Sequence, residues 1–314
     1  MSAELVTVVV PTLNRAATLR RALESVVAQT HEELEVLILD DGSNDATAAL
    51  VAAHTDRRVR LISHPCRIGF VANWTFGVRL ARGEYISILG DDDHYDETFL
   101  SSRLEAFRKW PEAVAVTGAF RMQREDEDLG SLSRRPAEVA RAFSGPDLGK
   151  LALGVSGEWF NGATLYRKTV LQAVWDEASM GGTALDWAVH ILLASQKDAK
   201  VVYLPDPEIT LTVHPGQESV ANREWLAKCC AASALQLWYS GTNVGRGRLG
   251  RIMREGLAKQ VGHYARWLWD QGRVEEARRL FLAELSINPR DAVTWLRYGR
   301  TLARWTWPKP GRGS

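Results

Sequence analysis

An apolar stretch from Leu5 to Val10 constrains the fold more than any other feature of this sequence. Its residues are mostly β-branched and continuous rather than alternating, which is typical of a strand buried on both faces of a mostly parallel sheet. Pro11 is expected to end this strand. Apolar residues at helical spacing follow over residues 15–30, and a second apolar strand runs from Leu34 to Leu39. This order predicts a βαβ unit at the start of an α/β fold.

The alternation of strands and helices continues along the chain. The predicted helices span residues 48–54, 71–80, 100–110 and 185–193, and the predicted strands span 59–62, 85–89, 113–117, 160–167, 201–205 and 209–214. This spacing predicts an open α/β sheet, in which ligands bind beyond the carboxyl ends of the strands. Residues 123–136 have no apolar period and are expected to form an exposed loop, either a lid over a substrate or, as we favour, a solvated loop.

Two acidic clusters follow predicted strands. Asp40 and Asp41 come after the second strand, and Asp91, Asp92 and Asp93 come after the fourth. Three adjacent carboxylates repel one another, so a folded chain keeps them as a solvated turn or as a site for a hard cation. Two clusters at one edge of one sheet would be a coincidence if both were only turns, and we therefore favour the cation site.

The glycine loops that usually bind phosphate are missing from the sequence. Neither GxGxxG nor GxxxxGK follows the first strand. A phosphate ligand at this edge would therefore need a metal. One or two carboxylates that hold an ion bridging a diphosphate are the expected arrangement for Mg²⁺ or Mn²⁺.

Four segments, taken in order, resemble the nucleotide-binding half of the family 2 glycosyltransferases, which have the GT-A fold. The segments are Val8–Arg15 (VVVPTLNR), Ser25–Thr30 (SVVAQT), Val36–Ser43 (VLILDDGS) and Gly83–Ile86 (GEYI). The resemblance covers about residues 4–120 well and extends more loosely to about residue 220. It implies a GT-A-like, Rossmann-related mixed sheet flanked by helices, followed by a C-terminal helical appendage.

The resemblance also implies a site for a nucleotide-diphosphate sugar donor. The positions that it places around the nucleotide are Pro11, Thr12, Asn14, Asp41, Arg67, Asn73 and Asp91. Among these, Asp41 would accept a hydrogen bond from the base, and Asp91 would lie near the ribose or the diphosphate.

The metal ligands implied by the resemblance lie in and near the triple aspartate. Asp92 would be the principal ligand, with Asp93 assisting. His214 would approach the metal or the diphosphate, although a lone histidine at a strand end is more often structural. Many family members have an aspartate where this chain has Gly90, so the sequence leaves open which of the three aspartates touches the ion.

Asp186 is the predicted general base. It follows Gly181 and Gly182, which resemble the family's glycine-rich turn before an acidic pair on a helix, although only one carboxylate of that pair is present here. The alternative is that Asp186 only favours the start of the helix through its charge. Inversion at the anomeric carbon needs a base on the face opposite the leaving diphosphate, and Glu158 is the reserve candidate.

The resemblance therefore implies a metal-dependent, inverting glycosyltransferase acting on an acceptor hydroxyl. One rival is a sugar nucleotidylyltransferase, which should have a glycine-rich loop with a basic residue after the first strand, and the segment PTLNRAAT lacks that loop. The other rival is a non-catalytic sugar-nucleotide-binding scaffold that works through the C-terminal helices.

The chain divides into a predicted catalytic domain, residues 1–220, and a helical region, residues 221–314. A net charge of +1 argues against a general nucleic-acid binder, yet residues 241–314 contain 15 Lys and Arg against 6 Asp and Glu. We predict a helix over 225–239, a glycine linker over 241–250, and one tetratricopeptide-like helical pair from Gly272 to Leu302. One repeat cannot bury its apolar face alone, so this pair is expected to pack on the catalytic domain or on another subunit.

Three cysteines cannot form a disulfide framework, and no apolar run is long enough to cross a membrane. The N-terminus has no signal-peptide pattern, and these features together predict a cytoplasmic protein. Trp295, Trp305 and Trp307 alternate with basic residues near the C-terminus. This pattern fits peripheral contact with an anionic membrane, or a helix face used for packing or self-association.

Overall fold

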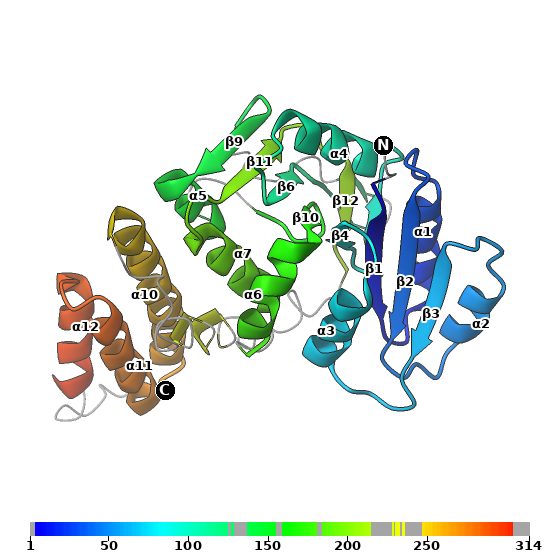
Figure 1. The fold of residues 1–314 in the computed structure, drawn as a ribbon. Helices are drawn as coiled ribbons and strands as arrows, with labels where there is room; N and C mark the ends of the chain where they lie inside the picture. The colour runs from blue at the N-terminus through cyan, green and yellow to red at the C-terminus, as the bar shows by residue number, and fades with distance from the viewer. Residues whose placement is uncertain are drawn as a thin grey trace.

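The computed structural model describes residues 4–124, 127–128, 137–154, 159–180, 184–214, 228, 230–232, 234–235 and 247–303. Within these residues, the centre of the molecule is an eight-stranded sheet with the order β3-β2-β1-β4-β10-β6-β11-β9 (Figure 1). Its strands are β1 (Val6–Thr12), β2 (Leu34–Asp40), β3 (Val59–Ser63), β4 (Tyr85–Ile88), β6 (Ala115–Gly118), β9 (Arg141–Ser144), β10 (Leu165–Arg167) and β11 (Lys200–Leu204). Strands β9 and β10 run antiparallel to their neighbours, and the other pairs are parallel.

Helices cover both faces of this sheet. They are α1 (Ala16–Val27), α2 (Thr47–Ala52), α3 (Phe70–Leu80), α4 (Phe99–Lys109), α5 (Gly145–Ala152), α6 (Lys168–Met180) and α7 (Leu185–Ser195). Three C-terminal helices, α10 (Gly247–Asp270), α11 (Val274–Ile287) and α12 (Ala292–Ala303), lie at the end of the molecule opposite β3 (Figure 1). The predicted mixed α/β sheet flanked by helices, with a C-terminal helical part, is confirmed.

Successive residues of each central strand belong to different cores. In β1, Val8 and Val10 join the core beneath α1, α2 and α4, whereas Val9 joins the core beneath α3, α5, α6 and α7. Side chains alternate across a strand, so a strand covered on both faces is apolar at most of its positions. This is the physical reason for the continuous apolar run that begins at Leu5.

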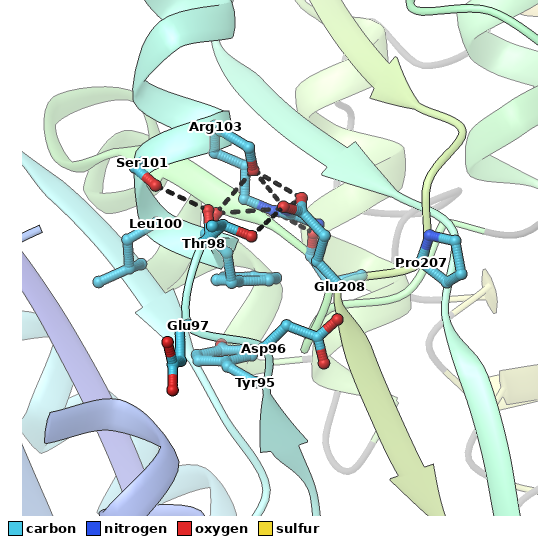
Figure 2. Close-up of polar contacts among 12 residues, drawn as sticks. Tyr95, Asp96, Glu97, Thr98, Leu100, Ser101, Arg103, Pro207 and Glu208 are labelled. Carbon is cyan, nitrogen blue, oxygen red and sulfur yellow. Dashed lines mark hydrogen bonds and ion pairs between the residues drawn. The ribbon is translucent and has the colours of Figure 1, made fainter. Parts of the chain in front are cut away.

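A second, four-stranded sheet lies in the order β5-β12-β7-β8. It contains β5 (His94–Tyr95), β7 (Arg121–Arg124), β8 (Glu127–Asp128) and β12 (Ile209–Thr212). Beside it, the fully buried guanidinium of Arg103 on α4 pairs with Glu208, which directly precedes β12, at 2.6 Å (Figure 2). The pair therefore connects α4, which covers the eight-stranded sheet, to the segment that leads into β12 of the four-stranded sheet.

Several predicted boundaries were wrong, each for a local reason. Pro11 does not end β1, which continues to Thr12; the pairing of β1 with β4 stops at Val9, so the missing N–H of Pro11 is not needed on that side. Residues 123–124 and 127–128 pair as strands, although both lie in the loop expected over 123–136. Of the strand expected over 160–167, only Leu165–Arg167 pairs.

The C-terminal region also differs from the prediction. Residues 247–250, expected in a linker, are the start of α10, and α10 packs against both α11 and α5. Helices α11 and α12 lie where the helical pair was expected, and α10 packs against α11. The tetratricopeptide-like character of the pair stays a prediction. Met253, Leu257 and Val261 of α10 belong to the same apolar core as the central sheet, so α10 packs on the part of the chain that contains the sheet.

Among the described residues, no helix is both long and apolar enough to cross a membrane.

Candidate active site

One cavity of about 430 Å³ opens at the carboxyl ends of β1, β2 and β4. It is lined by Pro11, Thr12, Leu13, Arg15, Asp41, Arg67, Phe70, Asn73, Trp74, Gly90, Asp91, Asp92, Phe160 and Asp186. Eight of the site residues predicted from the sequence are in this lining, from segments that lie up to about 175 positions apart in the chain. The cavity is where an open parallel sheet is expected to bind its ligand.

The register of three parallel strands brings the acidic clusters to this edge. Thr12 pairs with Asp40, and Val9 pairs with Ile88. The N–H of Asp41 donates to the carbonyl of Thr12 at 3.0 Å, which holds the β1 and β2 ends together. The three strands therefore end at the same level of the sheet, and the residues that follow them face the cavity.

Asp91 and Asp92 are both buried and both contact Arg15. The Thr12 hydroxyl donates to Asp91 Oδ2 at 2.7 Å. Arg15 Nη1 donates to Asp91 Oδ1 at 3.1 Å and to Asp92 Oδ2 at 3.0 Å. His214 Nε2 lies 2.9 Å from the same Oδ2 of Asp92. Burial raises the pKa of Asp91, with Thr12 and Arg15 opposing that rise.

Asp93 points away from the cavity. Its Oδ1 accepts a hydrogen bond from the N–H of Thr212 at 3.0 Å, and it is not part of the cavity lining. Burial, followed by the nearby charge of Asp92, raises its pKa well above the usual value. In this arrangement Asp93 fastens the acidic turn to β12, and the side chains that face the ligand space are those of Asp91 and Asp92.

Gly90 leaves room for these carboxylates. A Cβ at this position would lie 2.8 Å from Asp92 Oδ1 and 3.1 Å from Asp93 Oδ2, so either carboxylate would have to move. This crowding is a local reason for glycine where many family members have aspartate.

Asp41 anchors the neighbouring loop. Its Oδ1 accepts from the N–H of Ile68 at 2.7 Å, and its Oδ2 accepts from the N–H of Gly69 at 3.1 Å. Gly42, at φ +81°, allows this approach, because a Cβ there would lie 2.9 Å from the backbone carbon of Cys66. The carboxylate retains further acceptor capacity toward the cavity.

The other predicted nucleotide residues differ in exposure. Arg67 is 68% exposed, and its Nε lies 3.9 Å from Asp41. Asn73 is buried and donates to the carbonyl of Leu39 at 3.0 Å, so its amide joins α3 to β2 at the cavity floor. Asn14 is exposed and outside the cavity lining; its Oδ1 accepts from the N–H of Asn44 at 2.8 Å and so holds two loops together.

Asp186 faces the cavity from the first turn of α7. Its Oδ1 accepts from the N–H of Trp187 at 2.8 Å, and no cationic side chain of the described residues pairs with it. Burial is the largest cause of a raised pKa for this carboxyl. Glu158, the reserve base, and the turn at residues 181–183 lie outside the described residues.

In the described part of the chain, no group of three Asp, Glu, His or Cys side chains is arranged to hold a metal ion. Asp91 and Asp92 nevertheless offer a pair of carboxylates that suits a divalent cation. The two aspartates direct one oxygen each at a single positively charged nitrogen of Arg15, which marks a cation position between them. Carboxylate oxygens are the ligands that Mg²⁺ and Mn²⁺ prefer. Such an ion would keep water or phosphate oxygens in its remaining positions.

Several contributors to the site have no role in the sequence prediction. Arg15 is one, although its place beside Thr12 and Asn14 in a matched motif was a usable signal. Arg21 is another: its Nη2 donates to the Asp92 carbonyl at 3.1 Å and to the Thr212 hydroxyl. Apolar wall residues without a predicted role are Leu13, Phe70, Trp74 and Phe160, and the ring centroids of Phe70 and Trp74 lie 4.4 Å apart.

Relatives with curated names match parts of the chain. The succinoglycan biosynthesis protein ExoO of Rhizobium meliloti is 38% identical over 146 residues, which are 46% of this chain and 39% of that protein. The GalNAc(5)-diNAcBac-PP-undecaprenol beta-1,3-glucosyltransferase of Campylobacter jejuni is 29% identical over 185 residues, which are 57% of each protein. This chain thus spans less than two thirds of either relative.

Solved structures match over most of the chain. S. aureus TarS 1–349 in complex with UDP has a TM-score of 0.65 at 16% identity, covering 91% of this chain and 81% of that one. The mannosyltransferase PcManGT from Pyrobaculum calidifontis, in complex with GDP-Man and Mn²⁺, has a TM-score of 0.58 at 18% identity, covering 95% of this chain and 80% of that one. At these identities the likeness shows the fold, which agrees with the GT-A-like prediction.

The family described as Glycosyl transferase family 2 matches residues 7–175, which are more than half of the chain and contain the acidic turn and most of the cavity lining. This chain is a member of glycosyl transferase family 2.

Proposed function

We propose that this protein is a metal-dependent, inverting glycosyltransferase that moves a sugar from a nucleotide-diphosphate donor to an acceptor hydroxyl. The observation that carries the proposal is that one cavity is lined by Asp91 and Asp92 on the acidic turn and by Asp186 on a separate helix. The two aspartates would hold Mg²⁺ or Mn²⁺ together with the diphosphate. Asp186 would face the acceptor.

Asp186 would act as the general base. The acceptor oxygen attacks the anomeric carbon, the new bond from carbon to the acceptor oxygen forms, and the bond from carbon to the diphosphate oxygen breaks on the opposite face. The acceptor proton passes to a carboxylate oxygen of Asp186. A pKa raised by burial makes this carboxylate a stronger base than an exposed aspartate.

The leaving-group side of the site would be formed by the acidic turn. A bound Mg²⁺ or Mn²⁺ would supply positive charge that neutralises the departing diphosphate. Asp92 would be its principal ligand. Asp91 contacts the same Nη1 of Arg15 as Asp92 does, and His214 Nε2 lies 2.9 Å from Asp92 Oδ2. Asp93, directed at Thr212, would support the turn rather than face the ion.

The donor is proposed to be a nucleoside-diphosphate sugar. TarS has been solved with UDP-GlcNAc, and PcManGT with GDP-Man and Mn²⁺, which are ligands of this class. In this protein, Asp41, Arg67 and Asn73 line the part of the cavity next to α3 and would surround the base.

Donor hydrolysis without acceptor tests the proposal. The protein is incubated with a panel of UDP- and GDP-sugars and Mn²⁺, and release of the nucleoside diphosphate is followed along with the melting temperature. We expect one donor to stabilise the protein, by about 2.7 kcal/mol at 100 times its Kd, and to be hydrolysed slowly. The Asp92→Asn variant should lose both effects. Full activity in excess EDTA would contradict metal dependence.

The two rivals have distinct outcomes in the same assay. A sugar nucleotidylyltransferase would release pyrophosphate from a nucleoside triphosphate and a sugar phosphate. A scaffold would be stabilised by a donor and would never release the diphosphate.

Contact with a membrane surface is proposed for the C-terminal helices. Trp295 and Leu296 on α12 are 50% and 67% exposed, while Trp305 and Trp307 lie outside the described residues. The Campylobacter relative is named for an undecaprenol-linked substrate, which suits an acceptor at a membrane. Flotation with anionic liposomes at low salt should carry the protein upward. A protein that stays at the bottom would leave this surface to self-association.

A further inference from the structure

Arg15 holds the place of a cation in the proposed metal site. It directly precedes α1, and its Nη1 lies 3.1 Å from Asp91 Oδ1 and 3.0 Å from Asp92 Oδ2. The side chains of Asp91 and Asp92 are 7% and 10% exposed, whereas that of Arg15 is 32% exposed. The two carboxylates are therefore fixed inside the protein, and the guanidinium reaches them from the open side of the cavity.

Electrostatics explain why this guanidinium is needed. Two adjacent carboxylates that are both buried repel each other, and each loses hydration. Arg15 offsets both effects with one charge placed between them. A divalent ion on the same two oxygens would meet Nη1 at very short range, so like charges would repel and the two cations would compete for the same space. The guanidinium and the ion exclude each other.

We propose that Arg15 is a positioning residue that occupies the metal position in the donor-free protein and gives it up when the donor's diphosphate arrives. This inference rests on the proposed function. The diphosphate supplies both the oxygens that complete the coordination of the ion and new anionic partners for the guanidinium. Metal binding is thereby coupled to donor binding, and the protein has low affinity for the ion alone.

The surroundings of Arg15 suit this exchange. Arginine keeps its charge at all accessible pH values, and its planar fork pairs with carboxylates and phosphates alike. Arg15 is itself part of the cavity lining, so its charged end is beside the space that a diphosphate would enter. Arg21 holds the Asp92 carbonyl and Thr212, and it keeps the acidic turn in place independently of Arg15.

Titration of Mn²⁺ in the absence of nucleotide tests the inference, with free Mn²⁺ measured by electron paramagnetic resonance. The variants are Arg15→Met, which removes the charge, and Arg15→Lys, which keeps it. Arg20→Met is the matched control, because Arg20 is exposed on α1, the helix that Arg15 directly precedes, and its loss changes the net charge equally. Asp92→Asn, added to Arg15→Met, locates the ion. Melting curves with and without Mn²⁺ accompany each titration.

We expect Arg15→Met to bind Mn²⁺ at least about tenfold more tightly than the wild type, within the usual range of coupling between two ligands. Its melting temperature should rise more on addition of Mn²⁺. Arg20→Met should match the wild type, and adding Asp92→Asn should abolish the gain. Arg15→Lys should lie nearer the wild type. If Arg15→Met does not fold, Arg15→Gln, which also removes the charge, takes its place in the comparison with Asp92→Asn.

Two contrary outcomes separate this inference from the proposed function. If wild type and Arg15→Met bind Mn²⁺ equally tightly, and Asp92→Asn abolishes binding in both, the metal site stands and the role of Arg15 is refuted. If no variant binds Mn²⁺ in an Asp92-dependent manner, even with UDP present, the metal dependence of the proposed function fails as well.

Discussion

Asp186 is the residue on which the proposed chemistry depends most. The general base typically contributes about 10²- to 10⁴-fold to the rate, so Asp186→Asn should lower kcat by that order and leave donor affinity nearly unchanged. Steady-state kinetics and donor titration measure the two effects. Asp176→Asn is the matched control, because that aspartate is 75% exposed and pairs with Arg79 on the surface. Near-normal kcat in Asp186→Asn would transfer the role to another carboxylate, such as Glu158.

The same carboxylate should affect stability in a pH-dependent way. Burial raises the pKa of Asp186 in the folded protein, so the folded state holds this proton more tightly than the unfolded chain does. Its stabilising contribution is complete below the pKa of the unfolded chain and is lost as the pH rises through the folded pKa. We therefore expect Asp186→Asn to raise the melting temperature at about pH 7 and to change it little at about pH 3.

Thermal melts of the variant and the wild type at both pH values measure this difference. A lower melting temperature for Asp186→Asn at neutral pH would mean that a partner stabilises the ionised carboxylate. That result would contradict a pKa of Asp186 raised by burial.

The sequence motifs predicted many of the residues that line the cavity, but they did not predict which side chains these residues contact. Thr12 is the last residue of β1, Asp41 and Asp91 follow the ends of β2 and β4, and a strand end has a defined place in an open α/β sheet. The contact of Arg15 with the acidic turn joins positions 76 and 77 residues apart, and no local pattern contains such a distance. The exposed position of Asn14 likewise follows from a turn whose partner is another loop.

At the scale of elements, the buried pair of Arg103 and Glu208 joins α4 to the segment before β12 (Figure 2). Arg103 also donates to the carbonyls of Phe99 and Ala163, and its guanidinium lies 3.6 Å from the Phe99 ring. Arg103→Met should lower the free energy of unfolding by about 3–5 kcal/mol, because it leaves a carboxylate without its buried partner. Urea denaturation measures the change.

Two companion variants make this result specific. Adding Glu208→Gln to Arg103→Met removes the unpaired charge and should recover part of the loss. Arg108→Met, on the same helix, removes a 61% exposed partner of Glu4 and should cost less than about 1 kcal/mol. Equal losses for Arg103→Met and Arg108→Met would show that burial does not govern this pair.

Element types were predictable wherever the apolar period was long. The predicted βαβ unit and the later helices of the N-terminal half are present within one to three residues of their expected ends. The start of α10 was assigned to a linker because glycines at positions 247 and 250 favour turns, and the packing of that helix on its neighbours overrides this preference. Strands β7 and β8 are mostly polar and have no apolar period. Backbone pairing in the small sheet stabilises them, and this pairing leaves no apolar pattern in the sequence.

At the scale of the whole molecule, α10 contacts the catalytic part through a glycine. A Cβ at Gly256 would lie 2.3 Å from Cδ2 of Leu153, at the end of α5. Gly256→Ala should therefore lower the free energy of unfolding by about 1–3 kcal/mol through overpacking, although alanine is ordinarily the better helix former. Urea denaturation measures the effect.

Leu153→Ala provides the complementary change. Alone it leaves a cavity and should cost about 2–5 kcal/mol, and together with Gly256→Ala it should cost less than the two losses added. Gly299→Ala on α12 is the control, because a Cβ there meets nothing within 4 Å, and it should be neutral or stabilise by up to about 1 kcal/mol. Strict additivity of the first two variants would place Gly256 and Leu153 out of contact.

The apolar core that α10 shares with the sheet limits how this protein can change in evolution. The predicted boundary near residue 220 suggests an appendage that could be exchanged between relatives, yet Met253, Leu257 and Val261 complete a core that also contains Val9 and Leu37. A recombination near residue 220 would replace α10 and expose the apolar residues of α5 that α10 covers. The new partner would fit only if the contact surface of α5 were inherited together with α10. The C-terminal helices are therefore expected to change through amino-acid substitutions rather than through exchange of the whole region between relatives.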